Sequence, residues 1–429
     1  MTTEQSGAAM LGRLRTAAGI SLGLDGYNLA VIGAILAWVA ADFHLGHVFS
    51  TLVVASVVVG TLVGGALAGW ITDRLGRRRV FAYDLVIFIL CALTSAAAPD
   101  VDVLLVSRLV MGMAIGADYA ISSAYVAEMA HTRSRGYQLG FVWLFWAVGS
   151  VVAYLLAAGA AAMFPPGVAW RLLLGLPALP AAFALVLRQR VPESPRWLTA
   201  AGRIGQGEAV VAQYGLEPFR YRPAALRRGE RFRRWALVCA PWFFYDFAAY
   251  GIGLLLPYLL QKSGMTGTEP SLLGAGVVTS LGVAGSLVGM LAIDRWGRRR
   301  LQGTSFLVPG LLMGAWALLP AERSFALFLI VVGLANALSM MGGLVTGVYP
   351  AEVFPTRQRA TAMGVGTAVS RVGAVAGVVA IGLLDSRYGL RGVVAGAGAA
   401  LAAAGLLTFW LGIETKARTL EDIAGEATS

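Results

Sequence analysis

The chain has 429 residues, of which 58% are hydrophobic and only 13% are charged, and its formal net charge is +11. Soluble domains carry about 25% charged residues, so this composition excludes a soluble globular enzyme and also a disordered chain. Half the usual charge cannot cover the surface of such a protein in water, and we therefore expect a chain that is solvated by lipid.

Apolar stretches long enough to cross a bilayer, which takes about 20 residues, follow one another along the chain. They fall at 17–41, 50–71, 80–98, 103–129, 138–163, 169–188, 235–260, 272–293, 300–319, 325–347, 360–384 and 390–412. This pattern predicts an all-α membrane protein with twelve transmembrane helices in two pseudo-symmetric six-helix bundles. The expected divisions are an N-terminal bundle (1–188), a cytoplasmic linker (189–234), a C-terminal bundle (235–412) and a cytoplasmic tail (413–429).

The positions of Lys and Arg predict the orientation. If the N-terminus lies inside, 27 of the 34 basic residues fall in cytoplasmic segments or at their edges. Cytoplasmic loops of membrane proteins carry such an excess, so we expect both termini in the cytoplasm of a multi-pass protein, in a bacterial plasma membrane. The basic charge then lies against anionic lipid headgroups, which accounts for it without a nucleic acid partner.

The two halves of the sequence repeat each other. TDRLGRRR (72–79) recurs as IDRWGRRR (293–300), and YVAEMAHTRSR (125–135) recurs as YPAEVFPTRQR (349–359) with six of eleven positions identical. Two parallel copies of a six-helix unit are typical of transporters that hold their substrate between the halves, near the middle of the bilayer.

Four ionisable residues fall near the middle of predicted helices: Asp25, Asp118, Asp246 and Arg371. A charge at that depth costs about 2.5–3.5 kcal/mol on insertion scales, so it persists where it pairs, faces water or binds a ligand. Internal ion pairs that lock helices together are the structural alternative. Because three acids face one base, we favour proton coupling by the acids and binding of an anion by Arg371.

Aromatic residues accompany these charges. Trp242, Asp246 and Tyr250 recur at intervals of four residues and so share one helix face, which we interpret as a cavity wall. Trp143 and Trp146 on the fifth predicted helix would suit a flat or partly apolar solute, such as an aromatic carboxylate. Packing against lipid or neighbouring helices is the alternative for both sets.

Carboxylates and guanidinium groups recur at the predicted cytoplasmic ends of the helices in both halves. We predict that they form ion pairs that hold an inner gate shut, and solvated charges that bind lipid headgroups are the alternative. The candidate gating residues are Asp73, Arg77, Glu128, Arg133, Asp294, Arg298, Glu352 and Arg357.

Several motifs resemble the sugar-porter-like branch of the major facilitator superfamily. They are GWITDRLGRRR (69–79), RLVMGMAIG (108–116), the two repeated YxAE segments, ESPRWL (193–198) and ETKARTLEDI (414–423). Further stretches are similar to the phosphate:proton symporters, namely ADYAISSAYVAE (117–128), PWFFYDFAAYG (241–251), AEVFPTRQRATAMG (351–364) and SRVGAV (370–375).

This narrower resemblance implies that Asp25, Asp118, Tyr119, Trp242, Asp246 and Tyr250 are site residues. Three positions depart from that family. Trp146 stands where it usually has a glutamine, Arg371 where it has a lysine, and Asn28 where it has a second acid. The same general pattern occurs in relatives that carry organic acids.

We therefore expect a secondary active transporter and not an enzyme. The predicted activity is proton-coupled symport of a small anionic solute, either an organic or aromatic carboxylate or phosphate, by alternating access. A sugar or polyol porter and a non-coupled facilitator are the alternatives. We expect no cofactor apart from the coupling proton and no metal site. The expected partners are a small-molecule substrate and the lipid bilayer, without nucleic acid, for a chain that acts as a monomer.

Overall fold

The computed structural model describes residues 3–222, 226–253, 256, 259–260, 268–319 and 325–426, and all regular structure within them is helical. The first bundle contains α1 (Thr3–Asp42), α2 (His47–Leu75), α3 (Arg77–Ala96), α4 (Val101–Met129), α5 (Arg135–Met163), α6 (Pro166–Gly175) and α7 (Ala178–Gln189). The short helices α8 (Pro195–Ala200) and α9 (Ile204–Tyr214) follow. The second bundle contains α10 (Arg228–Gly253), α12 (Thr268–Trp296), α13 (Arg298–Leu318), α14 (Phe325–Thr346), α15 (Tyr349–Val353), the 3₁₀ turn η1 (Thr356–Gln358) and α16 (Arg359–Leu411). The last helix in the described residues is α17 (Leu420–Ala424).

Ten helical segments in the described residues are long and apolar enough to cross a membrane, and α6 and α7 together make one of them. The 53 residues of α16 would extend about 80 Å at 1.5 Å per residue, far more than one crossing needs. The backbone of Gly389, with φ of +60°, breaks α16 into two crossings. With α10 as a further crossing, the predicted twelve-helix architecture is confirmed.

Several helix ends differ from the predicted ranges by a few residues, and α10 begins at Arg228, inside the predicted 189–234 linker. The differences at α1 and at the sixth predicted helix have local causes. Helix α1 begins at Thr3, fourteen residues before the apolar stretch, because a helix can continue into water where it finds a packing surface. That surface is α9, since a side chain at Gly7 would overlap the carbonyl oxygen of Tyr214. The sixth predicted helix is divided into α6 and α7 by a turn at Leu176 and Pro177.

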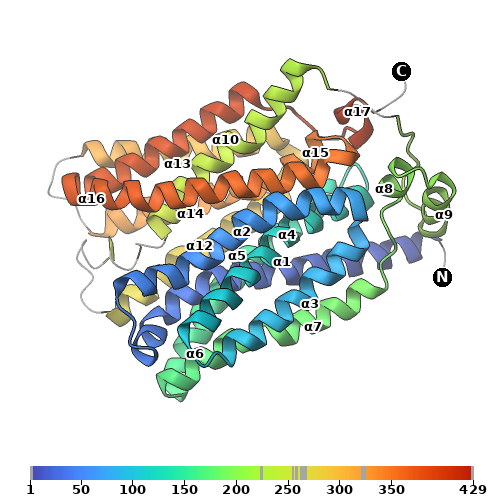
Figure 1. Ribbon diagram of the computed structural model, residues 1–429. Helices are drawn as coiled ribbons and strands as arrows, with labels where there is room; N and C mark the ends of the chain where they lie inside the picture. The colour runs from blue at the N-terminus through green and yellow to red at the C-terminus, as the bar shows by residue number, and fades with distance from the viewer. Residues whose placement is uncertain are drawn as a thin grey trace.

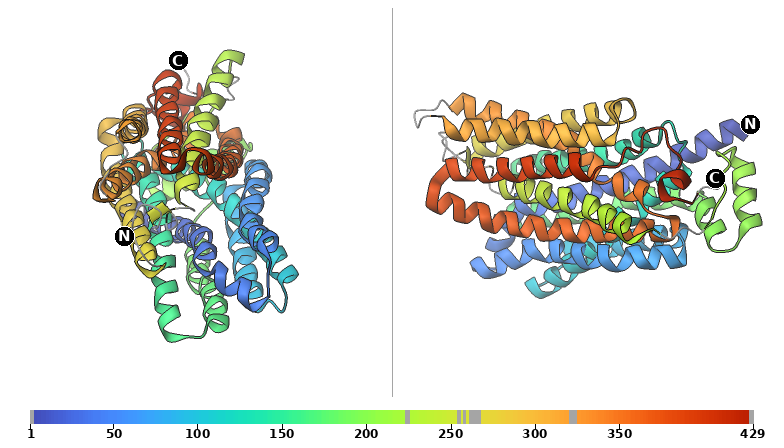
Figure 2. Two further views of the ribbon diagram at one scale, coloured as in Figure 1. Left: turned by 90° about the vertical axis from the view of Figure 1, so that its left-hand side faces the viewer. Right: turned by 90° about the horizontal axis from the view of Figure 1, so that it is seen from above.

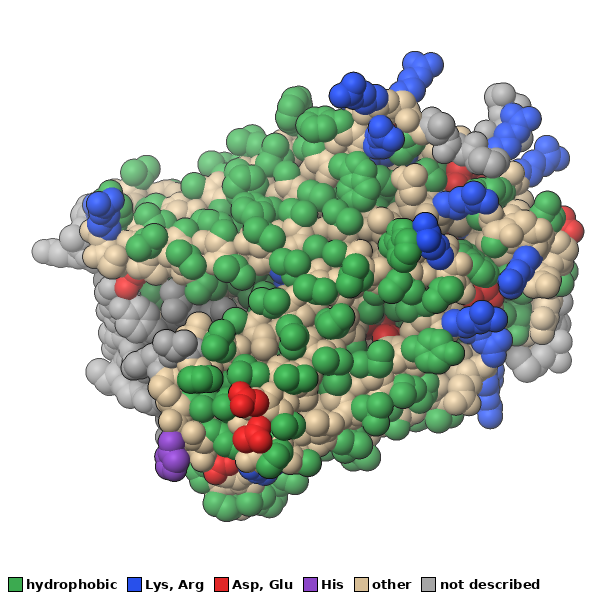
Figure 3. Space-filling model, viewed as in Figure 1, with side chains coloured by type: hydrophobic (Ala, Val, Ile, Leu, Met, Phe, Trp, Pro, Cys, Tyr) green, Lys and Arg blue, Asp and Glu red, His purple; other side chains and the backbone are tan. Residues whose placement is uncertain are grey.

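The two bundles lie side by side, and both termini lie at the same end together with α8, α9 and α17 (Figures 1 and 2). We call this the basic end, because most of the Lys and Arg side chains visible on the face shown gather there (Figure 3). Hydrophobic side chains cover the helices between the two ends, and Leu155, Leu383 and Trp410 are among the exposed ones. This band matches a surface that faces lipid.

Glycines bring the bundles together where α2 packs against α16. A Cβ atom on Gly364 would overlap the carbonyl oxygen of Gly65, and one on Gly69 would overlap that of Ala360. Small residues allow helix backbones in a membrane to approach this closely. Helices α5 and α12 form the second seam, where Gly140 packs against Met290.

We predict that Gly364→Val lowers the melting temperature of the purified protein, because the added side chain separates α2 from α16. Overpacking of this kind costs about 1–3 kcal/mol. Gly382→Val is the matched control on the same helix, since a Cβ atom there meets nothing within 4 Å. Thermal unfolding followed by tryptophan fluorescence measures both variants, and equal melting temperatures would contradict the close seam.

Candidate functional site

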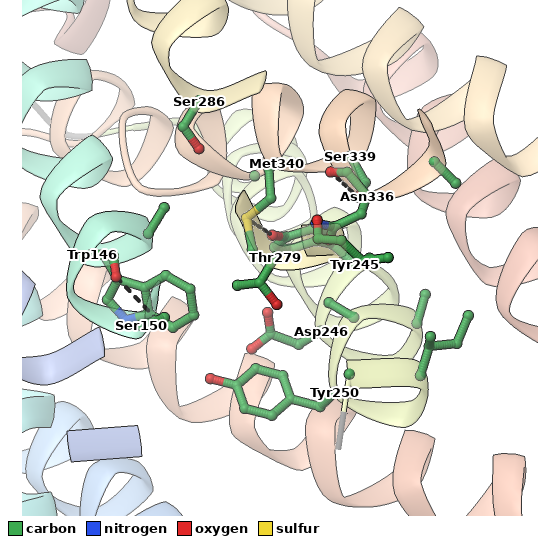
Figure 4. A pocket seen from close by; sticks show the side chains of 18 of the residues that line it. Trp146, Ser150, Tyr245, Asp246, Tyr250, Thr279, Ser286, Asn336, Ser339 and Met340 are labelled. Carbon is green, nitrogen blue, oxygen red and sulfur yellow. Dashed lines mark hydrogen bonds between the residues drawn. The ribbon is translucent and has the colours of Figure 1, made fainter. Parts of the chain in front are cut away.

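A cavity of about 200 Å³ lies between the two bundles, and we call it the central cavity. Helices α1, α4 and α5 form one wall, while α10, α12, α14 and α16 form the other (Figure 4). Among the residues that line it are all five predicted substrate-binding residues and one predicted proton-coupling acid: Tyr119, Trp146, Trp242, Tyr250, Arg371 and Asp246. Segments more than 250 residues apart in the chain therefore meet there.

Arg371 of α16 is the cation of the central cavity. Its side chain is 3% exposed, one terminal nitrogen lies 3.5 Å from Asp246 Oδ2, and the other donates to the hydroxyl of Tyr250. Within the described residues, the Nε atom of Arg371 finds no acceptor and Asp246 Oδ2 accepts no hydrogen bond. A guanidinium has five N–H donors, so this one retains donors for a further acceptor.

Aromatic rings form the part of the central cavity nearest the basic end. The indole of Trp143 lies 5.3 Å from the ring of Tyr119 and 5.9 Å from that of Trp242, measured between ring centres. Trp143 also fills the space beside Gly347 in the other bundle, where a Cβ atom would overlap its indole. Trp146 Nε1 donates to the hydroxyl of Tyr119 at 2.6 Å. These contacts join rings of α4, α5 and α10 across the two bundles.

Neutral polar groups occupy the wall that the second bundle forms. Thr279 and Ser286 come from α12, and Asn336 and Ser339 come from α14 (Figure 4). The amide of Asn336 donates to the carbonyl of Val278 at 2.7 Å, which leaves its oxygen available to a ligand. The sequence analysis did not single out these residues, because hydroxyl and amide side chains are common inside helices and carry no spacing signal.

Asp118 does not line the central cavity, contrary to the prediction that the acids share one hollow. Its neighbour Tyr119 faces the cavity, and consecutive helix residues point about 100° apart, so Asp118 faces the interior of its own bundle. There its Oδ1 atom accepts from Arg188 and from Ser122, each at 2.8 Å. Arg188 also pairs with Asp84 at 2.7 Å.

Arg188 was counted with the cytoplasmic charges because it ends an apolar stretch. The structure instead buries this side chain inside the first bundle. The interior of the described protein thus holds more basic partners than the prediction of three acids against one base assumed. A single arginine at the edge of an apolar stretch does not reveal whether it points inward or outward.

Asp25 also lies outside the lining of the central cavity and is only 1% exposed. No donor among the residues that the structure describes binds its Oδ2 atom, and the charges of Arg188 and Arg371 both act on Asp25. Nearby, the buried Arg108 donates to the side-chain and backbone oxygens of Asn28 at 2.9 and 2.7 Å.

An ion-pair cluster at the basic end joins the two bundles. Glu128 of α4 lies 2.9 Å from Arg77 of its own bundle and 2.8 Å from Arg359 of the other. Arg77 also pairs with Asp73 at 3.0 Å and donates to the carbonyl of Thr356 across the seam. All four charged groups are buried, so the cluster is a specific contact and not a set of solvated charges.

The second bundle repeats this arrangement. Glu352 lies 2.7 Å from Arg298 of its own bundle and 2.8 Å from Arg135 of the first. Asp294 pairs with Arg298 at 2.9 Å and accepts from the backbone N–H of Tyr137 at 2.7 Å. We call the Glu128 and Glu352 clusters together the paired latch.

Two predicted gating residues are not part of the paired latch. Arg133 is exposed, and Arg357 donates to the backbone carbonyl of Ala200. The arginine two positions later in each repeat makes the ion pair, because Arg135 and Arg359 stand at the first position of α5 and α16. The repeated RxR pattern marked both positions without distinguishing them.

Glutamates outside the spanning helices cap the helices that follow the DRxG motifs. Glu193 accepts from the backbone N–H groups of Arg77 and Arg78 at 3.0 and 3.1 Å, and Glu414 does the same at Arg298. Burial raises the pKa of Glu193, and its backbone N–H donors and Arg77 lower it only in part. The two glutamates stand 221 residues apart, the offset of the DRxG repeat, so this spacing was the signal that could have revealed them.

Known proteins resemble the whole chain. The profile of the family described as sugar (and other) transporter matches residues 16–426. The putative metabolite transport protein YaaU of Escherichia coli (strain K12) is 30% identical over 88% of this chain and 86% of its own. The galactose-proton symporter of the same strain is 28% identical over 96% and 92%.

Among solved structures, the MFS (major facilitator superfamily) proton:xylose symporter XylE bound to 6-bromo-6-deoxy-D-glucose is similar, with a TM-score of 0.83. The match covers 97% of this chain and 98% of that one at 21% identity. At this identity the likeness shows the fold alone, which is the twelve-helix fold of the major facilitator superfamily.

We predict that Arg135→Ala and Arg359→Ala weaken the closure of the basic end. Each variant leaves a buried glutamate with one arginine fewer, and breaking a buried ion pair costs about 3–5 kcal/mol. Arg133→Ala is the matched control because its side chain is exposed. The measurement is maleimide labelling of a cysteine at Ser150 in the central cavity, in a background without the two native cysteines. Equal labelling of all variants from the basic end would contradict the paired latch.

Proposed function

Because the chain belongs to the sugar (and other) transporter family, a family of multi-pass membrane transporters, we propose that it carries a small anionic solute together with protons. The favoured solute is an organic acid. The observation that carries this proposal is Arg371, a buried cation on the wall of the central cavity with unused N–H donors. The proposal goes beyond the family, whose members are described as carriers of sugars and other solutes.

A guanidinium recognises a carboxylate or phosphate through two parallel hydrogen bonds, which makes it the side chain best suited to a planar anion. Inside a cavity with mostly apolar walls, this attraction is much stronger than in water. A neutral solute would gain little from such a charge. The buried cation therefore supports an anion as substrate.

Asp246 supplies the coupling to protons. It pairs with Arg371 at 3.5 Å in the structure and so occupies part of the position that a substrate anion would take. When the anion binds Arg371, the Asp246 carboxylate loses its counter-charge in a buried site, and an uncompensated buried charge is costly. Protonation of Asp246 removes that cost, so substrate and proton bind together.

The rings of Tyr119, Trp143, Trp146 and Trp242 favour an organic acid over inorganic phosphate. Flat rings offer stacking and edge contacts to an apolar or aromatic body, whereas phosphate gains only from charged and hydrogen-bonding groups. We infer that the carboxylate lies at Arg371 and the body of the solute lies against these rings.

The paired latch supports alternating access. We assign the basic end to the cytoplasm from the excess of Lys and Arg there, which places both termini, the 189–234 linker and the 413–429 tail on that side. With this orientation the structure is closed toward the cytoplasm. Opening requires the four crossing charges to separate and the two bundles, 1–188 and 235–412, to rock within one monomer in a bacterial plasma membrane.

A sugar or polyol is the second candidate substrate. Thr279, Ser286, Asn336 and Ser339 form a neutral polar wall that can hydrogen-bond hydroxyl groups. The relatives named as a galactose-proton symporter and a proton:xylose symporter point the same way. In that case Arg371 and Asp246 would form a structural ion pair, and a non-coupled facilitator would ignore the proton gradient altogether.

A ligand screen distinguishes these candidates. We predict that benzoate-like acids, nicotinate or short carboxylates raise the melting temperature of the purified protein, whereas galactose and xylose leave it unchanged. A ligand at 100 times its Kd stabilises a protein by about 2.7 kcal/mol, which is a readily measured shift. Stabilisation by hexoses alone would overturn the proposed anionic substrate.

We predict that Arg371→Lys weakens carboxylate binding at least about tenfold, because an ammonium cannot form the two parallel hydrogen bonds of a guanidinium. Asp246→Asn is predicted to retain exchange of the acid but to lose accumulation driven by a pH gradient, since an amide does not titrate. Uptake into proteoliposomes, with and without that gradient, measures both. Ser339→Ala is the control on the neutral wall, and equal proton-driven uptake by Asp246→Asn and the unmodified protein would exclude Asp246 as the coupling acid.

A further inference from the structure

One guanidinium inside the first bundle holds two carboxyl groups. The terminal nitrogens of Arg188 donate separately to Asp84 Oδ1 at 2.7 Å and to Asp118 Oδ1 at 2.8 Å. Arg188 also donates to Ser21 Oγ at 2.6 Å and lies over the ring of Phe81. The side chains of all three charged residues are at most 4% exposed. This cluster belongs to α1, α3, α4 and α7 and lies outside the lining of the central cavity.

The two carboxyl groups thus share one counter-charge. If both were ionised, Asp84, Asp118 and Arg188 together would carry a net charge of −1 inside the bundle, and an uncompensated buried charge is costly. A proton on one of the two carboxyl groups removes that charge. Asp118 Oδ2 accepts from no N–H or O–H donor in the described part of the chain, which leaves it available to that proton.

We propose that Asp84 and Asp118 form a carboxyl dyad that shares one transported proton, with Arg188 as the residue that holds the two groups in register. This inference rests on the proposed proton-coupled function and adds Asp84 and Arg188 to it. With one shared proton, the dyad and Arg188 together are neutral. When the proton leaves, the three groups carry a net charge of −1.

The charges around the dyad connect it to the substrate. Asp25 of α1 is acted on by both carboxylates of the dyad, by Arg188 and by Arg371 of the central cavity. Two tyrosines of α4 are also close to these charges, since Asp25 acts on Tyr119 and Arg188 acts on Tyr125. Asp25 is therefore within electrostatic range of both the cation that binds the substrate and the cation that holds the dyad.

The position of the dyad suits release toward the basic end. Asp84 follows Arg77 of the paired latch by seven residues on α3, and Asp118 precedes Glu128 by ten on α4. At 1.5 Å per residue the dyad lies about 10–15 Å from the latch, at the depth where Tyr119, the neighbour of Asp118, lines the central cavity.

Infrared spectroscopy of the reconstituted protein tests the dyad without any substrate. Protonated carboxyl groups give a carbonyl stretching band that disappears on titration with base. We expect Asp84→Asn and Asp118→Asn each to remove the same component of this band, because the two groups share one proton. Asp102→Asn, an exposed acid on α4, is the control and leaves it unchanged. If this component of the band survives in both dyad variants, the proposal is overturned.

Arg188→Lys gives a second test if an asparagine variant folds poorly. A lysine keeps the positive charge but cannot bridge two carboxyl groups with two separate nitrogens in a rigid fork. We expect the pH at which the band disappears to move by at least about one unit. An unchanged titration would show that Arg188 does not hold the dyad.

Transport of benzoate by proteoliposomes separates this inference from the proposed function. We expect Asp84→Asn to exchange benzoate within about twofold of the unmodified protein while its accumulation driven by a pH gradient falls at least about tenfold. Full accumulation by Asp84→Asn would overturn the dyad. Failure of the unmodified protein to bind or exchange benzoate would count against the proposed function, and the infrared result would still decide the dyad.

Discussion

A charge inside a lipid-solvated bundle needs a counter-charge or a ligand, and this requirement organises the interior of the protein. Arg371 forms an ion pair with Asp246, and Arg188 forms ion pairs with two acids of its own bundle. The glutamates of the paired latch each form ion pairs with two arginines. In water such pairs would contribute about 0–1 kcal/mol, but burial makes the loss of one partner costly. The pairs are therefore able to act as two-state contacts, either complete or separated, and conformational change in a transporter needs such contacts.

Duplication explains why the basic end closes symmetrically. Each repeat contributes a glutamate, an arginine on its own side and an arginine that crosses to the other bundle, so the two copies complete each other. Neither bundle satisfies its own buried glutamate fully. The closed state is consequently stabilised by both repeats at once, and the glycine seams at α2–α16 and α5–α12 bring the backbones close enough for the arginines to reach.

Sequence alone predicted the helices, the repeat and six of the residues that line the central cavity, because hydropathy and helical periodicity act over many positions. Trp242, Asp246 and Tyr250 were recognisable as one face for this reason. Single residues were harder to place. Whether Arg188 points inward depends on Asp84 and Asp118, which are 104 and 70 residues away. The choice between Arg133 and Arg135 depends on where α5 begins. Such contacts between distant segments leave no local pattern.

The contact between Trp143 and Gly347 offers a way to follow the separation of the two bundles by fluorescence. The indole of Trp143 rests there against a backbone without a side chain, at the meeting point of the two bundles. Separation of the bundles would expose this ring to a more polar environment. The molecule thus contains an intrinsic fluorophore at the point where its halves part, and the emission of Trp143 would follow that motion without an attached dye.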